Sequence, residues 1–288
     1  ELLRDADAAM YRAKAAGRNT SETFDAGLRL EALRVLDLES DLRRSLSRGD
    51  FQPFFQPIVD LDDGRVVAYE ALLRWHHPAR GVLLPGSFLS VAQDSGLIEH
   101  IDWQVLEQAI AAIPDLCPGE GYICINVSPR HLHSRVFVAR LQELLAKAGV
   151  DGRQLRVELT EGALLEGSES VHHSLAQLRQ AGIVAQIDDF GTGYSALSYL
   201  HRFPIGALKI DRSFVAGMAA ELATSGRSAV VGAILAMARS LGLEVIAEGI
   251  ETPAQRELLM GLGCRLGQGY LFGHPVPLTT VPLVVPEG

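Results

Sequence analysis

Polar and charged side chains recur along the chain at positions where short apolar runs end. They are Glu70, Asn126, Glu158, Asp188, Asp189, Lys209, Glu248 and Gln268. Most carry carboxylate or amide oxygens, which favour Mg²⁺ or Mn²⁺ over Zn²⁺. Carboxylates gathered at one place repel one another unless cations lie between them. Two such cations about 3.5–4 Å apart can activate a water and stabilise the leaving oxygen of a phosphoester.

Each of these residues also has a structural interpretation that the sequence leaves open. Glu158 shares a strand face with Arg156, and Lys209 shares one with Asp211, so each could form a simple ion pair instead. For the remaining residues the structural roles are local: an exposed strand edge for Glu70, a turn cap for Asn126, and a helix cap with a solvated neighbour for Asp188 and Asp189.

Adjacent strand residues point to opposite faces, so Asp188 and Asp189 can share one site only where their strand ends. Gly191 and Gly193 follow and supply the turn that such an end needs. We therefore expect the strand to stop at the two aspartates.

Short apolar runs that alternate with longer helical segments must position these side chains. We expect strands at residues 52–59, 66–72, 122–127, 155–159, 184–187, 207–210, 244–247 and 264–267. Helical segments separate most of them, at 104–113, 136–148, 168–181 and 228–241. This alternation predicts an α/β fold, a TIM-like (β/α)8 barrel whose active site lies at the carboxyl ends of the strands. The connection 60–65 is too short for a parallel crossover, so the first strand is expected to be antiparallel.

The first 49 residues have a different pattern. Residues 1–19 resemble a short helix that stops near Gly17, and 20–27 form a polar joint. A leucine-rich helix follows and ends at Gly49, with Leu30, Leu33, Leu38, Leu42 and Leu46 at roughly helical spacing. We expect this stripe to pack on the next domain. The predicted domains are 1–19, 20–49 (linker and leucine-rich helix) and 50–288.

Composition narrows the functional classes. The net charge is −9, which argues against binding to duplex nucleic acid. Three cysteines without a CxxC pair favour a reducing cytoplasm, and no apolar run approaches the roughly 20 residues of a membrane span. We expect no membrane contact by this segment. The chain begins without Met, so we expect it to be a piece of a longer protein. The sequence leaves open whether that longer protein has a membrane anchor outside this segment.

The histidines form no recognisable metal motif. His76 and His77 are adjacent, as are His172 and His173, while His131 lies in a polar turn. No HExxH spacing occurs. We interpret all of them as surface or loop residues.

The ordered motifs resemble those of EAL domains, a family of cyclic di-GMP phosphodiesterases. The motifs are Glu70-Ala71-Leu72-Leu73-Arg74-Trp75, Asn126-Val127-Ser128-Pro129, Glu158-Leu159-Thr160-Glu161, Asp188-Asp189-Phe190-Gly191-Thr192-Gly193, Leu208-Lys209-Ile210-Asp211, Ala247-Glu248-Gly249-Ile250-Glu251-Thr252 and Gln268-Gly269-Tyr270. Together they extend over about residues 40–280. The segment 5–19 resembles the C-terminal end of a GGDEF domain.

The resemblance implies a role for each matched residue. One divalent cation, Mg²⁺ or Mn²⁺, is expected on Glu70, Asn126, Glu158 and Asp188, and a second near Asp188, Asp189 and Glu248. It further implies that Lys209 orients or deprotonates the attacking water, and that Gln56, Arg74 and Gln268 contact the nucleotide while Glu251 supports the site. Glu161 is expected to anchor the loop 190–197 beside the metals.

The resemblance also implies a product and an assembly: the product is linear pGpG, and the domain forms a homodimer. Because Ca²⁺ is larger than Mg²⁺ and accepts looser coordination, we expect Ca²⁺ to bind the site without supporting hydrolysis and so to inhibit. Asp188 and Glu248 lie a few residues farther apart than is usual, and we expect the extra residues at 219–226. The alternative function is a cyclic di-GMP receptor with little or no turnover, as in degenerate members of the family.

Overall fold

The computed structural model describes residues 26–165, 169–191, 202–218 and 227–281. The helix expected at 1–19 and the extra residues at 219–226 lie outside these ranges. The chain divides into two compact units. One comprises Glu1–Phe51 with Trp75–Ile101, and the other comprises Gln52–Arg74 with Asp102–Gly288. We refer to the second as the barrel unit and to the first as the helical unit.

A sheet that closes on itself forms the barrel unit. The strand order is β10-β1-β9-β8-β7-β6-β5-β4-β2-β3, and an additional β1–β2 pairing closes the ring. The ring strands are β1 (Phe51–Asp60), β2 (Val66–His77), β4 (Tyr122–Asn126), β5 (Leu155–Thr160), β6 (Val184–Phe190), β7 (Ala207–Ile210), β8 (Glu244–Ala247) and β9 (Leu266–Gln268). Two short strands, β3 (Gly81–Leu83) and β10 (Val276–Pro277), extend the sheet.

The strand directions confirm the predicted barrel. From β2 through β4, β5, β6, β7, β8 and β9, each neighbouring pair is parallel. Strand β1 pairs antiparallel with β9, so it also runs against β2. The five-residue hairpin loop 61–65 is the cause, because it returns the chain beside β1 with no room for a crossover helix.

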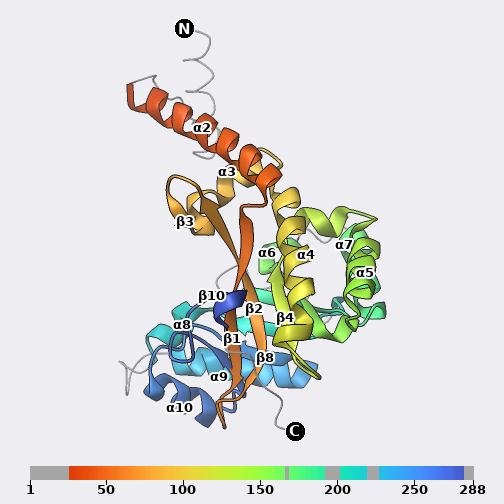
Figure 1. Ribbon diagram of the computed structural model, residues 1–288. Helices are drawn as coiled ribbons and strands as arrows, with labels where there is room; N and C mark the ends of the chain where they lie inside the picture. Colours follow the sequence, from red (N-terminus) through yellow and green to blue (C-terminus); the bar gives the residue numbers. More distant parts are fainter. Residues whose placement is uncertain (1–25, 166–168, 192–201, 219–226, 282–288) are drawn as a thin grey trace. The chain divides into compact units, whose positions relative to one another are not determined.

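Helices lie outside the ring of strands (Figure 1). The larger helices are α4 (Ile98–Leu116), α5 (Phe137–Ala148), α7 (Glu169–Gln180), α9 (Arg227–Leu241) and α10 (Pro253–Gly261). Short helices cap the connections at α6 (Glu161–Leu165), α8 (Arg212–Ala216), and the 3-10 turns Pro129–His133, Gly152–Gln154 and Leu278–Thr280. No helix in the described ranges is both long and apolar enough to cross a membrane.

The floor of the barrel is filled by apolar side chains and one ion pair. Ile58, Ala68, Tyr122, Cys124, Ile246 and Leu266 form a buried cluster. Arg156 stacks on Tyr122, with its Cζ 3.5 Å from the ring centroid, and donates a hydrogen bond to Glu244. The pairing of Arg156 with Glu158 that the sequence left open is therefore wrong. Arg156 lies two residues before Glu158 on β5, toward the amino-terminal end of the barrel, so its partner is Glu244 at the start of β8.

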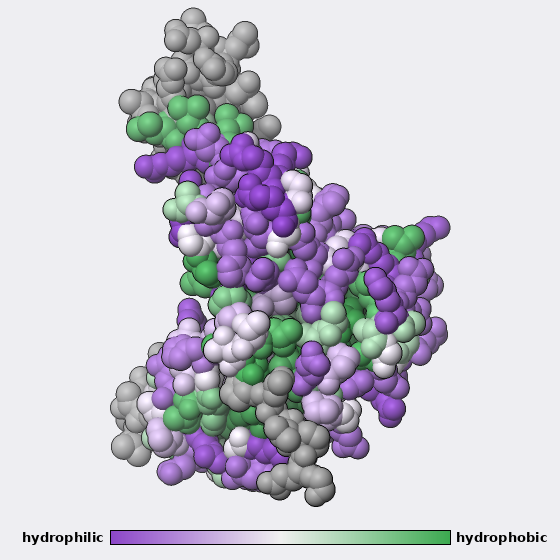
Figure 2. Space-filling view, in the orientation of Figure 1, coloured by the Kyte–Doolittle hydropathy of each residue, from purple (hydrophilic) through white to green (hydrophobic). Residues whose placement is uncertain are grey.

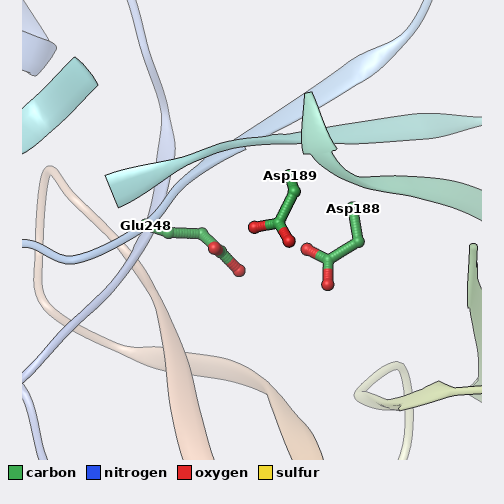
Figure 3. A group of neighbouring side chains, drawn as sticks. All are labelled: Asp188, Asp189 and Glu248. Atoms are coloured by element: carbon green, nitrogen blue, oxygen red, sulfur yellow. The ribbon is translucent and has the colours of Figure 1, made fainter. Parts of the chain in front are cut away.

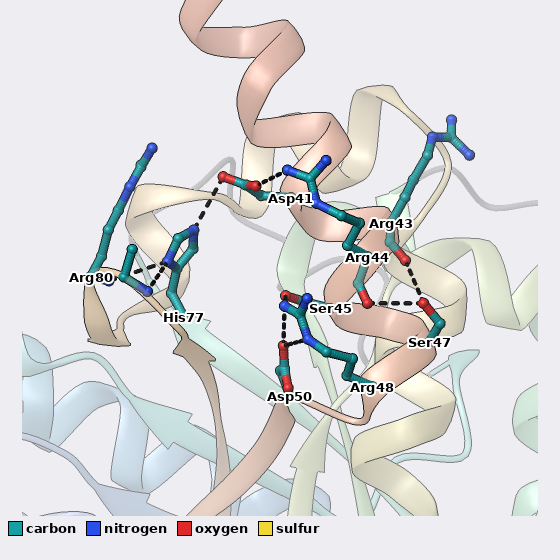
Figure 4. A network of polar contacts seen from close by, with 10 residues as sticks. Asp41, Arg43, Arg44, Ser45, Ser47, Arg48, Asp50, His77 and Arg80 are labelled. Atoms are coloured by element: carbon teal, nitrogen blue, oxygen red, sulfur yellow. Dashed lines mark hydrogen bonds and ion pairs between the residues drawn. The ribbon is translucent and has the colours of Figure 1, made fainter.

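The helical unit contains α2 (Ala26–Arg48), β3, a 3-10 turn (Pro85–Ser87) and α3 (Leu89–Asp94). Polar contacts hold the end of α2 to the residues around it (Figure 4). His77 Nε2 lies 3.1 Å from Asp41 Oδ2, and Arg48 Nη2 lies 2.6 Å from Asp50 Oδ2. In the same unit, Trp75 stacks on Phe51 at 5.5 Å between ring centroids.

The leucine stripe of α2 is not one packing face. Leu42 is buried, whereas Leu30 and Leu33 are 59% and 48% exposed. The step from Leu33 to Leu38 is five residues, which breaks the helical repeat and turns the earlier leucines away. Figure 2 shows the resulting hydrophobic patch over the first half of α2, to which Leu36 also contributes.

Two histidines correct the expectation of surface positions. His77 and His131 are buried. His131 Nε2 lies 3.1 Å from Asp102 Oδ2, and its ring stacks on Phe137. The three cysteines are free and buried, and burial raises the pKa of the Cys117 thiol to about 12.

Candidate metal and catalytic site

The carboxyl ends of the parallel strands open into one cavity of about 300 Å³. Six residues expected at the site line it: Gln56, Glu70, Asn126, Asp188, Glu248 and Gln268. Glu251, the expected supporting residue, lines it too. The strands of a parallel barrel end at the same rim, which is why residues far apart in the sequence meet here.

Asp188, Asp189 and Glu248 form the tightest acidic group of the described residues. One carboxylate oxygen from each lies within 4.8 Å of those from the other two. Figure 3 shows the three side chains converging from β6 and from the end of β8. Such spacing allows one cation to contact several of these oxygens at once.

A backbone irregularity brings the two adjacent aspartates to the same side. Strand β6 continues to Phe190, so it does not end at Asp188 as expected. Its register with β7 shifts between Ile187 and Phe190, and Asp189 has a left-handed φ of 53°. Asp tolerates this conformation better than most residues. A bulge within β6, and not the end of the strand as we expected, therefore brings Asp188 and Asp189 to the same side.

Lys209 is the ammonium group at the centre of the carboxylates. Its Nζ lies 2.5 Å from Glu248 Oε1, 2.9 Å from Glu70 Oε2, 3.2 Å from Glu158 Oε2 and 3.5 Å from Asp188 Oδ1. Burial alone would lower the pKa of Lys209, but the four carboxylates outweigh it and hold the pKa well above its ordinary value. The lysine is therefore charged and acts as a hydrogen-bond donor.

Asp211 does not pair with Lys209. It caps α8 instead, accepting a hydrogen bond from the Ser213 amide at 3.0 Å. Lys209 lies inside β7 and points into the barrel, whereas Asp211 follows the strand at the start of the next helix. The simple lysine–aspartate pair is therefore wrong.

Amide side chains orient the buried glutamates. Asn126 Nδ2 donates to Glu70 Oε1 at 3.0 Å and to Glu158 Oε2 at 2.9 Å. Gln268 Nε2 donates to Glu70 Oε2 at 2.6 Å and to Gln56 Oε1 at 2.9 Å. This network joins β1, β2, β4, β5 and β9, so the positions of these side chains depend on one another.

The site holds more carboxylate charge than Lys209 neutralises. Burial, with Glu70 nearby, raises the pKa of Glu158 well above its ordinary value. Burial also raises the pKa of Glu248 to about 8 despite Lys209. Burial and the neighbouring Asp188 raise the pKa of Asp189 to about 6. Groups that resist ionisation together favour an additional cation among them.

The oxygen donors fit a divalent cation. Asp188 Oδ1 is buried and accepts no hydrogen bond from any residue that the structure describes. The ammonium group of Lys209 lies 3.5 Å from it. A buried acceptor without a hydrogen bond, beside two further carboxylates, is the arrangement that a metal ligand shows before its ion is bound.

Glu161 opens α6, three residues after Glu158, and is buried. Its Oε2 accepts a hydrogen bond from the Gly191 amide at 3.4 Å. This contact ties the start of the loop to the end of β5. The rest of that loop, from residue 192, lies outside the described ranges.

Arg74 is not brought into the cavity lining. Its Nη1 donates to the Leu73 carbonyl at 2.8 Å, and its Cζ lies 5.7 Å from the Phe54 ring centroid. Its contact with a nucleotide stays a prediction. Conversely, the cavity lining includes Arg212 and Tyr270, which the motif positions alone did not single out as contacts.

Gln186 is a further polar residue that the sequence reasoning passed over. It interrupts the apolar run of β6, two residues before Asp188 and on the same strand face. That position is the signal that could have identified it. Gln186 is fully buried and donates a hydrogen bond to Glu158.

A family model described as the EAL domain matches residues 39–275. This chain belongs to the EAL domain family. The EAL domain is 38% identical, over 98% of the chain, to the cyclic di-GMP phosphodiesterase NbdA of Pseudomonas aeruginosa. It is 39% identical, over 96% of the chain, to the bifunctional diguanylate cyclase/cyclic di-GMP phosphodiesterase MucR of the same organism. The chain spans only 36% and 40% of these two proteins.

Solved structures agree with the EAL assignment. The chain resembles a structure described as the PaMucR phosphodiesterase in complex with c-di-GMP, with a TM-score of 0.79 and 37% identity. The match covers 85% of this chain and 100% of that one. It also resembles the EAL enzyme Bd1971 in its cAMP- and cyclic-di-GMP-bound form, at 33% identity and a TM-score of 0.81, over 96% of this chain and 73% of that one. The EAL match at residues 39–275 therefore includes all eight strands of the ring.

Proposed function

We propose that this EAL domain hydrolyses cyclic di-GMP to linear pGpG with two divalent cations, Mg²⁺ or Mn²⁺. The observation that carries the proposal is the group of carboxylates at the barrel mouth: four of them surround Lys209, and Asp188, Asp189 and Glu248 offer oxygens within 4.8 Å of one another. The named activities of NbdA and MucR support the same chemistry. When bound, the two cations would lower the pKa of the attacking water and offset negative charge on the phosphoester oxygens.

The chain's own residues divide the remaining work. Glu70, Asn126, Glu158 and Asp188 hold the first cation, and Asp188, Asp189 and Glu248 hold the second. Lys209 is a charged donor, so it orients the attacking water rather than taking its proton. Glu248 has two proposed roles: it is a ligand of the second cation, and its Oε1 lies 2.5 Å from Lys209 Nζ, so it holds the ammonium group at the cavity.

The rim of the cavity suits a nucleotide. Gln56 and Gln268 present carboxamides to the cavity, and Gln268 also fixes Glu70. Glu251 supports the rim, and Arg74 remains a proposed contact to the nucleotide. Glu161 keeps the loop after β6 against the metal-binding residues.

The proposal extends to the surroundings of the EAL domain. We place it in the cytoplasm, where free thiols such as the three buried cysteines persist. Residues 1–19 are proposed as the end of a GGDEF domain, 20–49 as a linker with the leucine-rich helix, and 50–288 as the phosphodiesterase domain. The name of MucR, a bifunctional diguanylate cyclase/cyclic di-GMP phosphodiesterase, is compatible with a cyclase domain in the same protein. A homodimer is proposed from the family resemblance, and light scattering across protein concentrations tests it.

Product analysis tests the proposed reaction. The chain is incubated with cyclic di-GMP and Mg²⁺, and the nucleotides are separated by chromatography. We expect pGpG to accumulate, and chelation by EDTA to stop it. Tight binding of cyclic di-GMP without any pGpG, at every Mg²⁺ or Mn²⁺ concentration, would instead identify a receptor domain.

A further inference from the structure

Gln186 places a carboxamide inside the barrel beside Glu158. The register of β5 and β6 pairs the two residues directly. Gln186 Nε2 lies 2.6 Å from Glu158 Oε1. Gln186 comes from the strand that also carries Asp188, so it couples the two strands that supply these ligands.

The two oxygens of Glu158 have different partners. Oε1 accepts the hydrogen bond from Gln186, whereas Oε2 faces Asn126 at 2.9 Å and Lys209 at 3.2 Å. Asn126 lines the cavity, so Oε2 is the oxygen on the cavity side. Gln186 therefore fixes the position and plane of the Glu158 carboxylate, with one oxygen held by Gln186 and the other directed toward the cavity.

The orientation of the Gln186 amide has only one favourable form. Turning it over would place its oxygen 2.6 Å from a carboxylate oxygen, where two acceptors repel. With Nε2 toward Glu158, the Gln186 Oε1 atom is buried and accepts no hydrogen bond from the described residues. An apolar side chain would fill this space without that cost. The hydrogen bond to Glu158 is the contact that offsets this cost.

We propose that Gln186 is a positioning residue for metal binding: it locks Glu158 so that Oε2 is presented to the divalent cation. The inference deepens the proposed function and rests on its metal site. Groups that hydrogen-bond to a metal ligand typically affect metal affinity or activity by 10–100-fold. Gln186 itself does not contact the cation.

The test is Gln186→Met, which keeps the length of the side chain and removes the donor. Mn²⁺ is titrated into the metal-free protein in a calorimeter, with no nucleotide present. We expect the Kd for Mn²⁺ to rise by roughly 10–100-fold. In turnover assays, saturating Mn²⁺ should recover much of the lost kcat, and KM for cyclic di-GMP should stay within about twofold, because Glu158 is misplaced rather than absent.

Two further variants separate positioning from stability. Gln186→Asn keeps a carboxamide but is one methylene too short to reach Glu158, so it should weaken Mn²⁺ binding as Gln186→Met does. Leu145→Ala removes a buried side chain of α5, outside the strands that carry the site, so it should lower the melting temperature and leave the Mn²⁺ Kd unchanged. A folded Gln186→Met or Gln186→Asn protein that binds Mn²⁺ with the wild-type Kd would overturn the inference.

The wild-type chain distinguishes this inference from the proposed function. If it binds Mn²⁺ but releases no pGpG, the proposed function is wrong, and the Mn²⁺ Kd of the variants still decides the role of Gln186. If it turns over normally and Gln186→Met matches it in Kd, only the inference about Gln186 is wrong.

Discussion

Lys209 Nζ lies 2.5 Å from Glu248 Oε1, and the two residues come from β7 and the end of the neighbouring parallel strand β8. The same ammonium contacts three more carboxylates from β2, β5 and β6. Without a metal, Lys209 is thus the charge that keeps these acids together. Fold stability and metal binding are consequently linked at this one side chain.

Replacing Lys209 by Met tests that link. Removing one partner from a buried charged group typically costs roughly 3–5 kcal/mol of stability. We expect Lys209→Met to melt well below the wild type in EDTA, and the difference to narrow when Mg²⁺ supplies the missing charge. Turnover should fall by about 10²–10⁴-fold while cyclic di-GMP binding persists. An equal loss of binding would make Lys209 a phosphate contact.

Glu158→Gln should separate stability from activity. Burial and Glu70 already raise the pKa of Glu158, so a neutral isostere relieves repulsion in the metal-free protein. We expect the melting temperature in EDTA to rise, while Mg²⁺-dependent turnover falls by at least about 100-fold because a ligand is lost. Glu143→Gln, on the exposed side of α5, is the matched control and should change neither. Near-normal turnover of Glu158→Gln would show that Glu158 is not a metal ligand.

Calcium should occupy the site without supporting hydrolysis. Ca²⁺ accepts longer and less regular oxygen coordination than Mg²⁺, so it fits the acids but does not set the geometry for water attack. We expect Ca²⁺ to raise the melting temperature and to inhibit Mg²⁺-dependent turnover competitively. Full turnover with Ca²⁺ as the sole divalent ion would contradict a tightly arranged pair of cations.

Glu161→Ala tests the anchor of the loop after β6. Loss of the hydrogen bond from Gly191 frees the start of a loop that begins beside Asp188 and Asp189. Turnover and Mn²⁺ affinity should both fall. Glu161 also opens α6, so melting is measured in parallel. If the variant has a lower melting temperature but unchanged turnover and metal dependence, Glu161 stabilises α6 and does not anchor the loop.

The pH dependence of stability should reflect Asp60, away from the site. The Asp62 amide and the Arg265 guanidinium donate hydrogen bonds that lower the pKa of Asp60. A carboxylate with a lowered pKa stabilises the fold above its unfolded pKa of about 3.9 and loses that effect as the pH falls. Arg265 is largely exposed, so we expect Asp60→Asn to cost about 1 kcal/mol or less at pH 7. Urea unfolding should show this difference shrinking toward pH 3, and a difference that grew on acidification would refute it.

The sequence predicted the barrel well because strand alternation and the short connection at 60–65 are local signals. It also predicted which residues meet, since parallel strands end at one rim. It could not predict the bulge at Asp189, because the period of two along a strand gives no sign of a left-handed residue within it. Pairings across the barrel were missed for a related reason. Arg156 pairs with Glu244, and Lys209 pairs with Glu248 rather than with Asp211. In each case the partner lies at the same level along the barrel axis, in or directly after another strand, and the sequence separation gives no sign of it.

Turnover across a Mn²⁺ titration, for the wild type beside Asp188→Asn, tests the central claim most directly. Asp188 is the carboxylate proposed to serve both cations, and its Oδ1 is buried without a hydrogen bond among the described residues. We predict that the wild type converts cyclic di-GMP to pGpG in step with Mn²⁺ occupancy, and that Asp188→Asn forms no pGpG at any Mn²⁺ concentration although it folds and binds the nucleotide. Metal-independent hydrolysis by the wild type, or wild-type turnover by Asp188→Asn, would contradict the account.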